Sequence, residues 1–144
     1  MTEFREVNPD FWVAEQLSVE DIARAAANGF KTIVNNRPEN EEVGQPSDAE
    51  MKAAVERAGM SYRVLPFAGP PPPGIVSETA ALLERAQGPI LAYCRSGRRS
   101  ITAWALAQAL SGTRTPDEIV ALAAKAGYDL SSAKQALQTL APKG

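Results

Sequence analysis

The sequence contains no histidine and only one cysteine, and these two shortages exclude several kinds of site. A single cysteine cannot form a disulfide within the chain. Without histidine, a zinc site would depend on carboxylates and one thiol, whereas protein zinc sites usually combine several cysteines and histidines. We therefore expect no internal cross-link, no metal site and no organic cofactor.

Long apolar runs and an excess of one charge are also missing. The apolar runs end well short of the roughly 20 residues that a membrane-spanning helix needs, and the first ten residues, MTEFREVNPD, lack the pattern of a secretory leader. Lysine and arginine number 15 against 17 acidic residues, a net charge of -2 that provides no basic surface for nucleic acid. We expect a cytoplasmic protein that binds neither membrane nor nucleic acid. The oligomeric state stays open.

What the sequence does contain is enough for one globular domain. It has 144 residues, of which 44% are hydrophobic. Short strand-like runs alternate with alanine-rich helical patterns, which is typical of an α/β fold with a mostly parallel sheet. We expect a single domain over 1–144, with four or five central strands flanked by helices on both faces. Its core would span about 4–112, followed by a helical extension over 113–144.

The boundaries of the expected elements follow from local signals. Serine or threonine precedes several helical patterns as an N-cap, and three residues later Asp21 or Glu50 completes a capping box. Consecutive prolines in the segment FAGPPPPG favour an extended loop. The pattern predicts strands at 4–7, 11–16, 31–36, 61–66 and 89–94, and helices at 18–29, 47–59, 76–87, 100–112, 115–127 and 131–141.

The single cysteine stands where such a fold binds ligands. Cys94 ends the most apolar strand, and the loop CRSGRRS leads from it directly into a helix. Backbone N–H groups of such a loop, together with the helix N-terminus, form an anion site. Helix termini and nearby cations favour the thiolate, which is the nucleophilic form of cysteine. The residues expected to bind the anionic substrate from this loop are Arg95, Ser96, Gly97, Arg98 and Ser100.

Three residues of the loop have more specific expectations. The guanidinium of Arg99 can hold an oxyanion through two hydrogen bonds. Gly97 permits a backbone angle that a side chain would forbid. Ser100 either caps the following helix or donates a hydrogen bond to the sulfur.

A second polar loop, RPENEEVGQP, should rise at the same edge of the sheet because it follows the strand at 31–36. Its glutamates Glu39, Glu41 and Glu42 are candidates for a general acid, and the alternative for each is an acidic side chain in solvent. Arg37 either orients this loop or the substrate, or forms a structural ion pair with a nearby glutamate.

The segments GFKTIVNNRPENEE, SYRVLPF and GPILAYCRSGRRS carry a family resemblance. From Phe4 to about Leu110 the chain resembles the phosphatase-like domain family of beta-lactamase hydrolase-like bacterial proteins, which is similar in fold to dual-specificity tyrosine phosphatases. The resemblance implies a metal-independent hydrolase of phosphomonoesters. Cys94 would be the nucleophile, Arg99 would bind the oxyanion, and water would hydrolyse a cysteinyl-phosphate intermediate.

The chain departs from the usual tyrosine phosphatase pattern in three ways. Tyr93 replaces the histidine that precedes the cysteine. Four residues separate Cys94 from Arg99 instead of five, and the position with the usual spacing is Ser100. The loop FAGPPPPG, where the family takes its general acid, contains no acidic residue. Because alkoxides need protonation more than phenolates do, we expect weak activity that favours aryl phosphates.

Two other functions remain open from the sequence. The short CRSGRRS loop resembles that of rhodanese-type sulfurtransferases, in which Cys94 would carry a persulfide. The third possibility is a non-catalytic anion-binding or redox-sensing module, since an oxidised Cys94 has no second cysteine to resolve it. Tyr128 and the last two helices could cover the sheet, contact a second copy or cap the site, and the sequence does not rank these roles.

Overall fold

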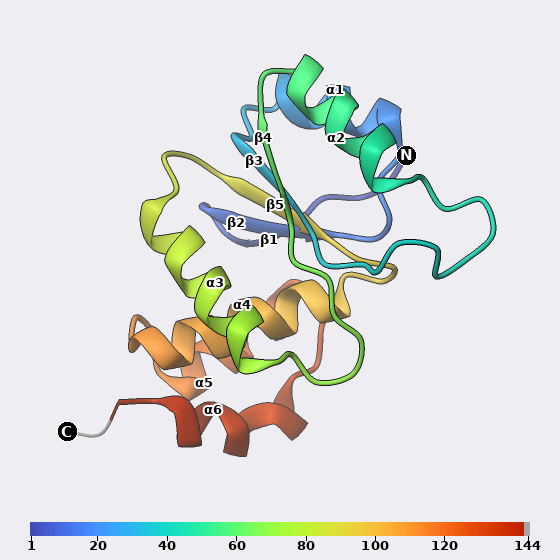
Figure 1. Cartoon of the computed structure of the whole chain (residues 1–144). Helices are drawn as coiled ribbons and strands as arrows, with labels where there is room; N and C mark the ends of the chain where they lie inside the picture. Colours follow the sequence, from blue (N-terminus) through green and yellow to red (C-terminus); the bar gives the residue numbers. More distant parts are fainter. Residues whose placement is uncertain (143–144) are drawn as a thin grey trace.

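The computed structural model describes residues 1–142, which form a five-stranded sheet between two layers of helices (Figure 1). The sheet order is β1-β2-β5-β3-β4, and only β1 runs antiparallel to its neighbour. The expected α/β class is confirmed. The strands are β1 (Arg5–Asn8), β2 (Phe11–Ala14), β3 (Thr32–Asn35), β4 (Ser61–Val64) and β5 (Ile90–Tyr93).

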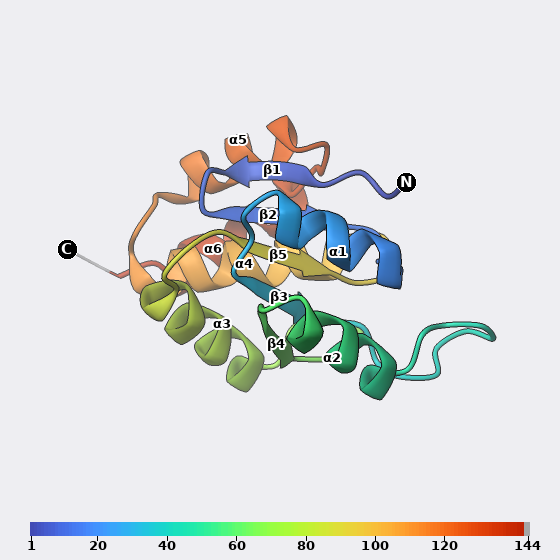
Figure 2. The same ribbon diagram turned by 90° about the horizontal axis from the view of Figure 1, so that it is seen from above.

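Helices cover both faces of the sheet, as expected. Two of them, α1 (Val19–Ala27) and α2 (Asp48–Arg57), lie on one face, and α3 (Pro73–Arg85) and α4 (Arg98–Ser111) lie on the other (Figures 1 and 2). The end of the chain packs against α4. It consists of α5 (Pro116–Lys125), a 3-10 turn (Ser131–Ala133) and α6 (Lys134–Leu140).

Capping boxes begin three of the helices. The side chains of Ser18, Ser47 and Thr115 each accept a hydrogen bond from the backbone of the third helical residue, whose carboxylate accepts one in return from the backbone of the cap. Two otherwise unpaired N–H groups are satisfied at each helix start. The three predicted starts are therefore confirmed at the level of individual hydrogen bonds.

Three predicted helix boundaries were wrong. Helix α3 begins at Pro73 rather than at Val76, because proline at the first helical position has its backbone angle preset and lacks an N–H that would have no partner there. Helix α4 begins at Arg98, two residues before Ser100. The predicted helix at 131–141 is divided into the 3-10 turn and α6.

The buried side chains form one cluster on each side of the sheet. In the larger cluster, Trp104 is fully buried and stacks on Phe11 with ring centroids 5.8 Å apart. Ile119 of α5 and Leu137 of α6 belong to the same cluster. The other cluster lies under α1 and α2 and includes Tyr93, whose pKa is raised mainly by burial.

Two possible features do not occur within residues 1–142. No helix in this part of the chain has the length and apolar character to cross a membrane. The same residues contain no group of three or more cysteine, aspartate or glutamate side chains arranged to hold a metal ion.

Candidate active site

The candidate site lies at the carboxyl ends of the central strands, where two buried asparagines fix the strand ends. The backbone N–H of Asn36 donates to the carbonyl of Tyr93 at 2.9 Å, and its side-chain amide donates to the carbonyl of Leu65 at 2.9 Å. The side-chain oxygen of Asn35 accepts from the backbone N–H of Arg37 at 2.8 Å. These bonds hold the loops after β3, β4 and β5 at one edge of the sheet.

The cysteine loop directs a backbone donor at the sulfur. Cys94 is fully buried, and the N–H of Gly97 donates to its Sγ at 3.0 Å. Gly97 has a φ of +91°, a left-handed angle that glycine adopts without strain, and α4 begins at the next residue. Helix α4 therefore starts with its N-terminus beside the sulfur, as an anion site requires.

Ser100 does not cap α4, because the helix has already begun at Arg98 and places Ser100 inside its first turn. The residue is buried, and no partner for its hydroxyl occurs among the residues that the structure describes. Its other predicted role, a hydrogen bond to the sulfur, was also wrong, because the hydroxyl makes no hydrogen bond to Cys94 in this structure.

Arg99 reaches across the loop and pairs end-on with a glutamate. Its Nη1 and Nη2 donate to the two carboxylate oxygens of Glu41, both at 2.8 Å, and Nη1 also donates to the carbonyl of Phe67 at 3.1 Å. The hydrogen bonds with Glu41, and next the charge of Cys94, raise the pKa of this guanidinium, which burial opposes. A guanidinium has five N–H groups. Three are used in these bonds, which leaves one N–H on Nε and one on Nη2 along the adjacent edge.

Glu41 is held between two arginines. Arg37, only 2% exposed, donates from Nε to Glu41 at 2.9 Å and from Nη1 to the side chain of Gln16 at 3.0 Å. Hydrogen bonds from Arg99, and to a smaller extent from Arg37, lower the pKa of Glu41 to about 2, although burial alone would raise it. The carboxylate is thus ionised at neutral pH. Its contribution to folding is complete above its ordinary value of 4.5 and is lost as the pH falls towards 2.

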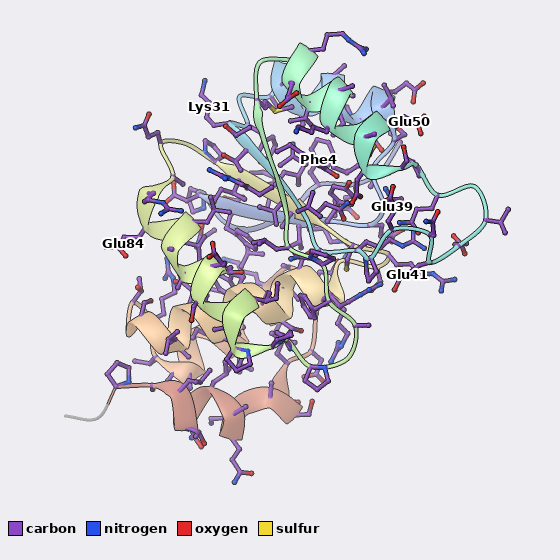
Figure 3. The ribbon with its side chains drawn as sticks, viewed as in Figure 1. Phe4, Lys31, Glu39, Glu41, Glu50 and Glu84 are labelled. Atoms are coloured by element: carbon purple, nitrogen blue, oxygen red, sulfur yellow. The ribbon has the colours of Figure 1, made fainter. Side chains whose placement is uncertain are left out.

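The other two glutamates of the loop are also engaged with the protein. Glu42 forms ion pairs with Arg95 at 3.2 Å and with Arg37 at 3.6 Å. Glu39 accepts from the backbone N–H of Asp48, at the start of α2, at 3.0 Å. Figure 3 shows Glu39 and Glu41 on the same projecting loop, between β3 and α2. Their predicted role as general acids stays a prediction, and Glu41 is bound here as an ionised partner of arginine.

Sequence reasoning missed three contributors to this site and left the role of a fourth, Tyr128, open. Gln16 follows the end of β2 at the same edge of the sheet, a position that could have marked it. The carbonyl of Phe67 could not be recognised, because a backbone group carries no sequence signal. From the end of the chain, the Tyr128 hydroxyl donates to the carbonyl of Ser96 at 2.9 Å, and the carbonyl of Asp129 accepts from Arg98 at 3.0 Å.

Comparison with known proteins identifies the family of this chain. Residues 3–111 match the model of the beta-lactamase hydrolase-like protein, phosphatase-like domain. The chain belongs to this family. A beta-lactamase hydrolase-like protein of Agrobacterium fabrum is 33% identical over 133 residues, and one of Xylella fastidiosa is 31% identical over 143 residues. The matches cover 92% and 93% of this chain but only 31% and 32% of those relatives, so the chain spans about a third of their length.

Solved structures agree with the family. A candidate phosphatase from Neisseria meningitidis is 31% identical, with a TM-score of 0.81 over 94% of this chain and 96% of that one. PTPMT1 superposes with a TM-score of 0.72 at 15% identity, over 96% of this chain and 93% of that one, which shows the shared tyrosine-phosphatase fold. The family and the fold support a phosphatase-type hydrolase function for the domain.

Proposed function

We propose that the domain hydrolyses phosphomonoesters with the Cys94 thiolate as nucleophile. The observation that carries the proposal is the convergence of donors on one place. The Gly97 N–H donates to Sγ at 3.0 Å, α4 begins beside it, and Arg99 lies close enough to Cys94 for the charge of the sulfur, after the hydrogen bonds with Glu41, to raise the pKa of its guanidinium. Such donors stabilise the charge that develops on phosphoryl oxygens during transfer.

The reaction would proceed in two displacements. Sγ attacks phosphorus, and the bond from phosphorus to the leaving oxygen breaks with its electron pair on that oxygen. The oxygen leaves as the anion or takes a proton from solvent. Water then attacks the phosphorus of the cysteinyl phosphate and loses a proton, the sulfur–phosphorus bond breaks with its electrons on sulfur, and inorganic phosphate departs.

The leaving group should decide the rate, because the carboxylate bonded to Arg99 is ionised and cannot donate a proton. The loop from Phe67 to Gly74 has no acidic residue, and Glu41 is ionised with a pKa of about 2. We expect kcat/KM for an aryl phosphate such as para-nitrophenyl phosphate to exceed that for glycerol phosphate by on the order of 10³-fold. Phosphate release without added metal measures both substrates. Equal values for the two would contradict the absence of a proton donor.

Glu41→Gln tests whether the carboxylate orients Arg99. The substitution keeps the shape but removes the charge that both arginines bind, so kcat/KM for the aryl phosphate should fall about tenfold. Glu56→Gln, an exposed substitution on α2, is the matched control and should leave the rate unchanged. A Glu41→Gln protein as active as the original would rule out the orienting role. Loss of a limb of the pH–rate profile would instead make Glu41 the acid.

Sulfur transfer is the second candidate, and one observation favours it. Only four residues lie between Cys94 and Arg99, so the loop encloses a smaller space than the five-residue loop of tyrosine phosphatases. In that case Sγ would take the outer sulfur of thiosulfate, releasing sulfite, and pass it to cyanide as thiocyanate. Thiocyanate formation without phosphate release would replace the proposed function. Binding of phosphate with neither reaction would leave an anion-binding module.

A further inference from the structure

The turn that follows α5 lies against the cysteine loop, although it comes after the region that matches the family. Two hydrogen bonds join them. The Tyr128 hydroxyl donates to the carbonyl of Ser96 at 2.9 Å, and Nη2 of Arg98 donates to the carbonyl of Asp129 at 3.0 Å. The end of the chain therefore contacts the loop that holds Cys94 directly.

The bond from Tyr128 acts on one particular peptide group. The carbonyl of Ser96 and the N–H of Gly97 belong to the same planar unit, and in a trans peptide they point in opposite directions. The carbonyl is held by Tyr128, while the N–H donates to Sγ of the cysteine at 3.0 Å. Fixing one end of this unit fixes the direction of the other.

Gly97 leaves the space that this contact needs. A Cβ on Gly97 would lie 2.1 Å from the hydroxyl oxygen of Tyr128 and 3.0 Å from the ring carbon that bears it. The φ of +91° already favours glycine at this position. The missing side chain thus serves two purposes, since it permits the loop angle and admits the tyrosine.

Tyr128 is itself anchored and keeps its proton. The guanidinium of Arg5, from β1, lies over its ring at 5.7 Å from the centroid. Burial is the main cause that raises the pKa of Tyr128, and the charge of Cys94 adds to it, whereas Arg5 opposes it. The hydroxyl is therefore a donor at neutral pH, as its bond to Ser96 requires.

We propose that Tyr128 is a positioning residue for Cys94. Its hydroxyl holds the Ser96–Gly97 peptide in the orientation that supplies an N–H to the sulfur. Tyr128 acts through this peptide, and no hydrogen bond joins it to Cys94 within residues 1–142. The expected fall in kcat rests on the proposed phosphatase function. The expected change in the ionisation of Cys94 does not.

Tyr128→Phe removes the hydroxyl and keeps the ring. Because the chain has one cysteine, the ultraviolet absorbance of the thiolate, corrected with the Cys94→Ser protein, reports this sulfur alone. We expect the midpoint of its pH titration to move upward by about half a unit to one unit, since a hydrogen bond to a charged acceptor is weakened. The kcat for the aryl phosphate should fall about fivefold with KM little changed.

The matched control is Thr139→Val, which removes an exposed hydroxyl that donates to the backbone carbonyl of Gln135 within α6, away from the cysteine loop. It should move neither the midpoint nor kcat. A Tyr128→Phe midpoint equal to that of the original protein, in a folded variant, would overturn the proposal. A shifted midpoint in a protein that releases no phosphate would sustain the positioning role and reject the proposed function.

Amide hydrogen exchange measured by NMR in the unsubstituted protein tests the same contact without any substitution. In the unsubstituted protein the Gly97 amide should exchange slowly, because it is bonded to Sγ in a buried position. In Tyr128→Phe it should exchange about fivefold to tenfold faster. A Gly97 amide that exchanges in the unsubstituted protein as fast as an exposed one would overturn the proposal without any substitution.

Discussion

Cys94→Ser is expected to lower kcat/KM for an aryl phosphate by on the order of 10⁴-fold or more. A serine hydroxyl keeps the position of the sulfur and can accept the same N–H from Gly97, but at neutral pH it stays protonated and needs a base. The chain contains no histidine to supply one. The whole advantage of an ionised thiol is therefore lost, and no neighbouring group replaces it.

The measurement is steady-state phosphate release, with inorganic phosphate binding and the thermal midpoint followed in parallel. Binding and stability should stay close to those of the original protein, because the donors around the sulfur are unchanged. A Cys94→Ser protein that retains full turnover would reject the nucleophile. An intermediate trapped by acid in the original protein, and absent from the variant, would show that phosphorus is bonded to the sulfur.

Arg99→Lys is expected to lower kcat/KM by on the order of 10³-fold, the second-largest effect. Arg99 uses one end of its guanidinium for Glu41 and the Phe67 carbonyl, and in the proposed reaction the adjacent edge would bind the phosphoryl oxygens. A lysine carries the same charge on a single nitrogen, so it cannot bind both carboxylate oxygens and present a two-donor edge to the ligand. Mainly kcat should fall, because the two donors bind the phosphoryl oxygens more strongly in the transition state than in the bound substrate.

A matched control for this substitution is Arg57→Lys at the exposed end of α2. It makes the same chemical change away from the site and should leave the rate unaltered. An Arg99→Lys protein within about threefold of the original would mean that positive charge alone is sufficient and that the two-donor edge has no special role.

Much of the fold could be predicted because its determinants are local. The capping boxes at Ser18, Ser47 and Thr115 are complete within four residues, and the alternation of strand and helix patterns defines the parallel sheet. The helix starts at Pro73 and Arg98 were misplaced for different reasons. The whole proline run was interpreted as an extended loop, whereas its last proline begins α3, and the start at Arg98 depends on how the preceding loop is held. In the second case the loop angle at Gly97 lets the helix begin early.

Some residues of the candidate site could likewise be predicted from local sequence, and others could not. Cys94, Gly97 and Arg99 lie within six residues, so their common loop was visible in the sequence. The pairing of Glu41 with Arg99 joins side chains from two loops far apart in the chain, and nothing in either segment specifies which of three glutamates makes it. Tyr128 was harder still, because one phenol hydroxyl and one carbonyl oxygen carry the contact.

The limits of the family match and the limits of the folding unit are different. The match ends at residue 111, yet Ile119, Ala123 and Leu137 are fully buried in the same cluster as Trp104. A protein shortened at that residue would retain Cys94 and Arg99 and would uncover the outer side of α4. A domain that follows this one in a longer chain would therefore have to be joined beyond α6 to leave this cluster closed. The stretch of sequence that matches the family model is shorter than the folded domain, which extends through α6.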